Sequence, residues 1–184
     1  RNLEKGLEAA AAAEGAPRVE VEYHSFELSP DTPVDFEGSE ADFLAGHKGL
    51  QIERVHEMLA NVTEVAAAAG LTYDFDHLQH TNTVKAHELL HAAKAAGRQH
   101  EMAERLMSAY FTEGRHVGRV DDLVALAEEV GLDGADVREA LETQRHLADV
   151  RLETELHEGV GRLETEQTTA DDDAADRGLA GRTD

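Results

Sequence analysis

The sequence predicts a mainly α-helical protein with a single β-strand. Apolar residues recur at helical spacing through about seven segments. Only one stretch, from Val19 to Tyr23, alternates apolar and acidic residues in the manner of a half-buried strand. Aromatic residues make up only 4% of the chain. The core is therefore expected to consist mostly of Ala, Leu and Val.

The chain opens with a predicted helix followed by the predicted strand. A helix is expected over residues 2–14, because its alanine-rich run has high helix propensity and Gly15 ends it. The strand covers residues 18–23. Beyond it the apolar phase shifts, which indicates a bulge or the end of the strand near His24 and Ser25. One strand alone cannot form a sheet, so it needs a partner.

Helices are expected through most of the remaining chain. The apolar spacing predicts helices over 39–47, 50–69, 83–96, 99–112, 120–130, from about 134 to 142, and 143–157. Ser39 is placed to cap the first of these, and either Asp133 or Asp136 can cap the helix that ends near Glu142. In the second, one buried stripe is expected to comprise Ile52, Val55, Leu59, Val62 and Ala66.

Composition excludes several functional classes. The 184 residues suit one domain, or one domain with an insertion, and carry a formal net charge of −22. Such a surface repels nucleic acids and anionic membranes. Strong acidity, scarce lysine and abundant alanine together favour a salt-adapted cytoplasmic protein. Without cysteine, the chain has no disulfide, no thiolate metal site and no cysteine nucleophile.

The two ends of the chain carry separate expectations. No apolar run approaches the length of a membrane span, and no signal peptide is visible. The chain begins with Arg1 inside a helical pattern, which suggests a fragment or a processed chain. Residues 162–184 are rich in Asp, Thr and Gly and poor in large apolar residues, so we expect an acidic, disordered tail.

One short motif points to metal chemistry. His87, Glu88 and His91 fit H-E-x-x-H, in which two histidines on one helix face hold zinc and the glutamate acts as a base. The chain contains 11 His and 39 acidic residues, so a chance match is unsurprising. The alternative is an amphipathic helix with partly buried histidines, and the sequence favours it.

Three motifs in a fixed order indicate a family. They are F-E-L-S-P-D at residues 26–31, N-T-x-x-A-H-x-L-x-H at 82–91 and L-x-x-A-Y-F-x-E-G at 106–114. Apolar positions between 123 and 141 continue the pattern. The set resembles DsbA-like oxidoreductases of the FrnE type, which belong to a superfamily that also contains 2-hydroxychromene-2-carboxylate isomerase.

The resemblance implies a thioredoxin fold interrupted by a helical insertion domain. Residues 1–38 would then be one helix and one strand of the thioredoxin fold, 39–144 the insertion, 145–161 the helix that returns to that fold, and 162–184 the tail. The family's C-x-x-C and its cis-proline segment are absent, so the pattern is incomplete at both ends. No catalytic, cofactor-binding or metal-binding residue of the family can be carried over onto this chain.

The implied activity is dithiol–disulfide exchange on protein or small-molecule thiols, with this chain inactive alone. A glutathione-dependent isomerase, which uses a serine in place of the first cysteine, is the main alternative. A zinc hydrolase acting through the H-E-x-x-H motif and a non-catalytic helical binding module are further alternatives. An unpaired strand edge would favour a homodimer.

Overall fold

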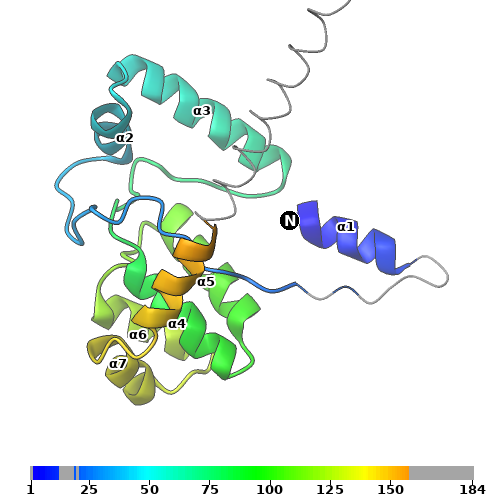
Figure 1. Ribbon diagram of the computed structural model, residues 1–184. Helices are drawn as coiled ribbons and strands as arrows, with labels where there is room; N and C mark the ends of the chain where they lie inside the picture. The colour runs from blue at the N-terminus through cyan, green and yellow to red at the C-terminus, as the bar shows by residue number, and fades with distance from the viewer. Residues whose placement is uncertain (1, 13–18, 20, 158–184) are drawn as a thin grey trace, which may run out of the picture.

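The computed structural model describes residues 2–12, 19 and 21–157. Seven labelled helices lie in this part of the chain, and an eighth helix covers residues 147–157 (Figure 1). The mainly helical prediction is confirmed. The parts of predicted elements that fall on residues 13–18, 20 and 158–184, including the acidic tail, lie outside the described residues.

A bundle of four helices holds the hydrophobic core. Its members are α4 (Val84–Ala95), α5 (Gln99–Phe111), α6 (Val120–Glu129) and α7 (Gly134–Glu142). Each helix contacts the next one along the chain, and α7 in turn contacts α4 (Figure 1). The largest fully buried apolar side chains of the bundle are Leu89, Met102, Leu123, Leu126 and Leu141. The core is aliphatic, as the low aromatic content predicts.

Local signals set several helix ends. Ser39 caps α2 (Glu40–Lys48) in a capping box, in which its hydroxyl accepts a hydrogen bond from the Asp42 N–H and its own N–H donates to the Asp42 carboxylate. Asp133, not Asp136, caps α7. Gly97 takes a φ of 71°, a left-handed conformation that lets the chain turn sharply from α4 into α5.

The α2–α3 pair forms a separate layer above the bundle (Figure 1). The predicted buried stripe of α3 (Ile52–Ala68) is wrong for most of its length, because only Val55 and Ala66 are buried and Val62 is 43% exposed. The reason is that α3 packs on α2 but on no other labelled helix of the described chain. Helical spacing marks an apolar face, whereas burial requires a neighbour to cover it.

His116 ties the loop before α2 to the bundle. Its ring is buried, its Nε2 donates to the Val34 carbonyl at 3.1 Å, and its Nδ1 accepts from the Gly118 N–H at 3.0 Å. Thr81 donates its hydroxyl to the same Val34 carbonyl at 2.7 Å. These hydrogen bonds satisfy the Val34 carbonyl and the Gly118 N–H, where the α2–α3 layer meets the bundle.

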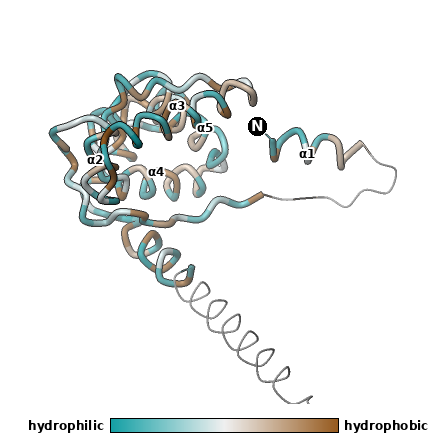
Figure 2. Tube along the Cα trace, turned by 90° about the horizontal axis from the view of Figure 1, so that it is seen from above, coloured by the Kyte–Doolittle hydropathy of each residue, from teal (hydrophilic) through white to brown (hydrophobic). Residues whose placement is uncertain are grey.

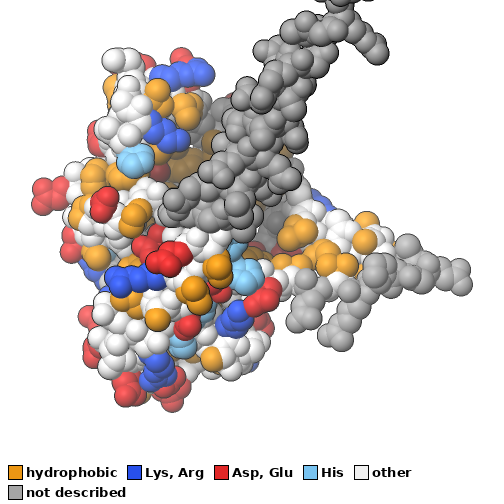
Figure 3. Space-filling model, in the orientation of Figure 1, with side chains coloured by type: hydrophobic (Ala, Val, Ile, Leu, Met, Phe, Trp, Pro, Cys, Tyr) orange, Lys and Arg blue, Asp and Glu red, His pale blue; other side chains and the backbone are white. Residues whose placement is uncertain are grey.

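The helix α1 (Asn2–Ala11) lies at the edge of the molecule in both ribbon and tube views (Figures 1 and 2). None of its residues is buried, and its Glu4 lies 3.8 Å from Nε2 of His100 in α5. Acidic side chains are spread over the face seen in Figure 3, with basic side chains between them. None of the helices that the structure describes combines the length and the apolarity needed to cross a membrane.

Candidate functional site

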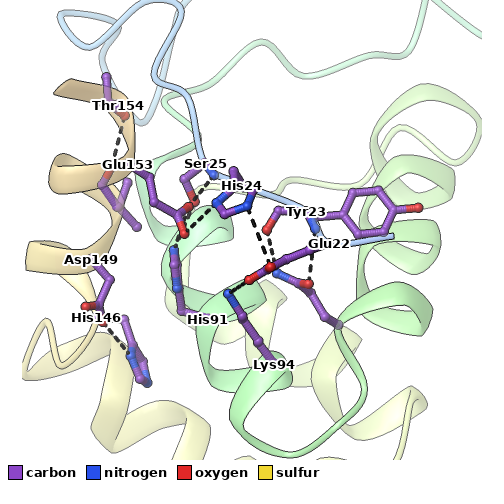
Figure 4. A network of polar contacts seen from close by, with 12 residues as sticks. Glu22, Tyr23, His24, Ser25, His91, Lys94, His146, Asp149, Glu153 and Thr154 are labelled. Atoms are coloured by element: carbon purple, nitrogen blue, oxygen red, sulfur yellow. Dashed lines mark hydrogen bonds and ion pairs between the residues drawn. The ribbon is translucent and has the colours of Figure 1, made fainter. Parts of the chain in front are cut away.

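Residues 22–27 run extended between the bundle and the 147–157 helix, where polar side chains gather (Figure 4). We call this set of contacts the 22–27 junction. Its members are Tyr23, Ser25, Glu27, His91, Gln99, Glu153 and Thr154. It brings together residues that lie up to 128 positions apart in the sequence.

Side chains of the helices hydrogen-bond the backbone of this segment at every second residue. The Gln99 side-chain amide bonds both the N–H and the carbonyl of Tyr23, at 3.4 and 2.9 Å. The Ser25 N–H donates to Glu153 at 2.5 Å, and the Glu27 N–H donates to the Thr154 hydroxyl at 3.3 Å. In an extended chain, alternate N–H groups point to the same side. One edge of the segment is therefore satisfied by helix side chains, and the other is directed away from them.

This arrangement explains the outcome for the predicted strand. The structure assigns no strand to the described residues of 18–23. A strand is defined by a ladder of hydrogen bonds to another strand, and here side chains supply the bonds on one edge. The segment keeps the extended backbone that its alternating pattern predicts, without a strand partner among the described residues.

Ser25, His91 and Glu153 meet in a buried polar cluster. The Ser25 hydroxyl lies 3.1 Å from Nε2 of His91, and a Glu153 oxygen lies 3.4 Å from that same nitrogen. Ser25 is 3% exposed and His91 is 8% exposed. A Ser-His-acid triad needs the carboxylate at the ring nitrogen opposite the serine. Because both partners share Nε2 and the hydroxyl is buried, the cluster is built for holding the segment and not for nucleophilic attack.

Charge stabilises the same cluster. Burial by itself would raise the pKa of Glu153, but the hydrogen bond from the Ser25 N–H and the nearby His91 and His24 outweigh it, so this pKa lies below its ordinary value. Lys94 forms an ion pair with Glu22 at the exposed end of the junction, and the hydrogen bond from Lys94 lowers the pKa of Glu22. Glu153 is thus held as a carboxylate by several donors at once.

The three residues of the H-E-x-x-H motif lie in different surroundings. His91 belongs to the 22–27 junction. His87 has a buried Nδ1 without a hydrogen-bond partner among the described residues, and burial lowers its pKa. Glu88 is 1% exposed, its two carboxylate oxygens lack hydrogen-bond partners among the described residues, and its nearest cation is Lys85, whose Nζ lies 3.9 Å away. Burial raises the pKa of Glu88, and the attraction of Lys85 and His146, with a weak contact from the His146 backbone N–H, offsets part of this rise.

These positions do not assemble a metal site. Within residues 2–12, 19 and 21–157, no three His, Cys, Asp or Glu side chains are grouped as metal ligands would be. A hydrolytic zinc site needs three protein ligands and an open position for water. Within the described residues, the motif lies on the packed helix α4, with Glu88 and His91 among its buried side chains.

Sequence reasoning missed four residues of the junction: Ser25, Gln99, Glu153 and Thr154. A partial signal exists for Ser25, because the apolar alternation shifts at this position. The other three are polar residues on helix surfaces, which look like ordinary solvated side chains until the fold places the extended segment beside them.

Comparison with known proteins decides the family. The model of the DsbA-like thioredoxin domain matches residues 2–161. The chain belongs to the DsbA-like thioredoxin domain family. Among solved structures, this DsbA-like chain is similar to the crystal structure of a probable DsbA oxidoreductase, SCO1869, from Streptomyces coelicolor. The TM-score is 0.77 at 31% identity, over 86% of this chain and 67% of that one.

A curated relative is also similar to this chain. The DsbA-like chain is 32% identical over 129 residues to the uncharacterized protein YwbO of Bacillus subtilis (strain 168). The match covers 70% of this chain and 60% of the relative's length.

Proposed function

We propose that this chain is the helical part, with one helix and one strand, of a FrnE-type dithiol–disulfide oxidoreductase or isomerase. The family match over residues 2–161 carries the proposal. The motifs at 26–31, 82–91 and 106–114 support the FrnE type. In this proposal, residues 1–38 belong to the thioredoxin fold, 39–144 form the helical insertion, 145–161 return to the thioredoxin fold, and 162–184 are an acidic tail.

The 22–27 junction has a clear part in this proposal. It fixes the extended segment to the helical domain on one edge, through Gln99, Glu153 and Thr154. The opposite edge is then oriented to pair with a strand of the sheet. The junction would thus set the angle between the helical domain and the sheet that bears the family's reactive thiols.

Thiol–disulfide exchange itself needs a thiolate that attacks a disulfide sulfur. The 184 residues contain no cysteine, so we propose that they contribute scaffold and a substrate-facing surface and no sulfur chemistry. The substrates are protein or small-molecule thiols and disulfides. The acidic, lysine-poor composition supports a salt-adapted cytoplasmic setting as part of the same proposal.

A turnover assay tests the chemical part of the proposal. The purified chain is mixed with a disulfide substrate and a dithiol reductant, and product is followed against the uncatalysed exchange and against an active DsbA-family enzyme. We expect the uncatalysed rate. A reproducible rate above this background, lost when Ser25 is changed to Ala, would contradict the proposal and would favour a serine-dependent activity.

A further inference from the structure

A cavity of about 380 Å³ lies between α2, residues 28–32, the connector at 80–83 and α5. It is distinct from the 22–27 junction, with which it shares no residue. Small-molecule sites in proteins are concave, mostly apolar and of about 300–1,000 Å³. This cavity therefore has the volume of a site for a small ligand.

Stacked rings form one wall of the cavity. The rings of His47 and Phe43 stack with centroids 5.2 Å apart and an interplanar angle of 13°. Phe43 also stacks on His80, at 3.6 Å and 23°. Glu40 accepts a hydrogen bond from Nδ1 of His80 at 2.7 Å, which fixes the His80 ring in this orientation. The result is a ladder of three nearly parallel rings.

Tyr110 supplies a polar group to the same cavity. The Tyr110 side chain is half-buried, and no hydrogen bond within residues 2–12, 19 and 21–157 involves its hydroxyl. Burial, and then the charge of Glu40, raise the pKa of Tyr110. The group therefore keeps its proton near neutral pH and is available as a donor.

Charge sets the class of ligand. Among the described residues that line the cavity, Glu40 and Lys48 carry full formal charges of opposite sign, and His47 and His80 count as neutral at pH 7. The lining is thus neutral in a chain whose formal net charge is −22. A neutral ligand avoids the repulsion that an anion meets near so acidic a protein.

We propose that this cavity binds a small, neutral, planar aromatic compound that carries a carbonyl oxygen. Its ring continues the ladder of His47, Phe43 and His80, and its carbonyl accepts a hydrogen bond from the Tyr110 hydroxyl. Aromatic stacking on these rings and a hydrogen bond from the Tyr110 hydroxyl are two interactions that the lining offers. The proposal does not depend on thiol–disulfide chemistry and can fail or succeed separately from it.

Benzamide is a suitable probe, because it is neutral, planar and carries one amide carbonyl. Its binding is titrated by saturation-transfer NMR, with amide chemical shifts of the labelled chain recorded in parallel. We expect saturable binding at one site, with shifts confined to residues around the cavity. Tyr110→Phe removes one oxygen atom and is expected to weaken binding roughly 5–10-fold, the value of one hydrogen bond.

Two further variants complete the experiment. Phe43→Leu removes the central ring of the ladder and is expected to weaken binding to a similar extent. Tyr73→Phe is the matched control, since Tyr73 does not line this cavity, and binding should stay within about twofold of the parent. Circular dichroism verifies that each variant is folded. If Phe43→Leu does not fold, Tyr110→Phe decides the question.

Three results would each overturn the proposal. They are the absence of saturable benzamide binding to the parent chain, unchanged affinity in Tyr110→Phe, and an equal loss of affinity in Tyr73→Phe.

Discussion

The Ser25 hydroxyl lies 3.1 Å from Nε2 of His91, and both side chains are buried. Glu153 reaches the same nitrogen at 3.4 Å and also accepts the Ser25 N–H. Serine, histidine and glutamate are the residue types of a hydrolase triad, but here they form the attachment of an extended segment to two helices. The role of the three residues is decided by their contacts, because the serine and the glutamate approach the same ring nitrogen of the histidine.

Removing the Glu153 carboxylate should destabilise the fold. Glu153→Ala leaves the Ser25 N–H without its acceptor and removes the carboxylate beside His91, which costs about 1–3 kcal/mol in the free energy of unfolding. Urea denaturation measures this loss. Glu155→Ala, an exposed glutamate on the same helix, is the control and should shift stability by less than about 0.5 kcal/mol. Equal effects of the two substitutions would contradict a special role for Glu153.

The contribution of Glu153 should also depend on pH in one direction. The pKa of Glu153 in the folded chain is lowered from its ordinary 4.5. Its stabilising effect is therefore complete above this value and is lost as the pH falls through the folded-state pKa. We expect the stability difference between the parent and Glu153→Gln to shrink in acid. A difference that grows on acidification would show that the sign is wrong.

Glu88 should oppose folding near neutral pH. Burial raises its pKa above the ordinary 4.5, and the attraction of Lys85 and the weakly placed backbone N–H of His146 offset only part of this rise. Glu88→Gln keeps the shape and removes the charge, so the variant should be more stable by about 1 kcal/mol or more. The gain should vanish below the ordinary pKa, where the carboxyl is protonated in both the folded and the unfolded chain.

Thermal unfolding across a pH series measures the Glu88 effect. Glu64→Gln on the exposed face of α3 is the matched control and removes one negative charge without relieving a buried one. A loss of stability in Glu88→Gln near neutral pH would mean that Lys85 and the His146 backbone stabilise the carboxylate by more than its burial costs.

His116 should remain neutral in the folded chain. Its Nδ1 accepts the Gly118 N–H, and burial lowers its pKa below the ordinary 6.5. Because the folded-state pKa is the lower one, its contribution to stability is present above 6.5 and is lost as the pH falls below that value. NMR titration of the ring should give a pKa under 6.5 and the tautomer with the proton on Nε2. A ring protonated near neutral pH would contradict the contacts with Val34 and Gly118.

Salt should stabilise the chain. A formal net charge of −22 makes the compact state repel itself, and ions screen this repulsion over a Debye length of about 10 Å at 0.1 M. We expect the midpoint of thermal unfolding to rise steadily with KCl concentration. Sorbitol at matched osmolality is the control for general solvent effects, and a midpoint insensitive to KCl would contradict salt adaptation.

Features with a local cause could be predicted from the sequence. Ser39 and Asp133 cap their helices because a short polar side chain next to a helix start bonds the free N–H groups of the first turn. The bundle helices follow from apolar spacing alone. For these elements, the residues that decide the structure lie within a few positions of one another.

Features that depend on distant neighbours could not be predicted. Val62 belongs to the apolar stripe of α3 but is half exposed, since no other labelled helix of the described chain covers that side. The Ser25–His91 contact spans 66 positions and the Ser25–Glu153 contact spans 128. Nothing in the spacing of these polar residues marks them as partners, so the junction becomes visible only when the fold places them together.

The central claim is that residues 39–144 serve as the helical domain of a DsbA-type oxidoreductase. Its most direct test is a chimera in which this segment replaces the corresponding part of the Streptomyces coelicolor protein, to which the chain as a whole is similar at a TM-score of 0.77. Disulfide turnover is compared with the unmodified Streptomyces protein and with a chimera carrying the core-disrupting Leu89→Asp. We predict that the chimera keeps measurable turnover and that Leu89→Asp abolishes it. A folded chimera without turnover would contradict the claim.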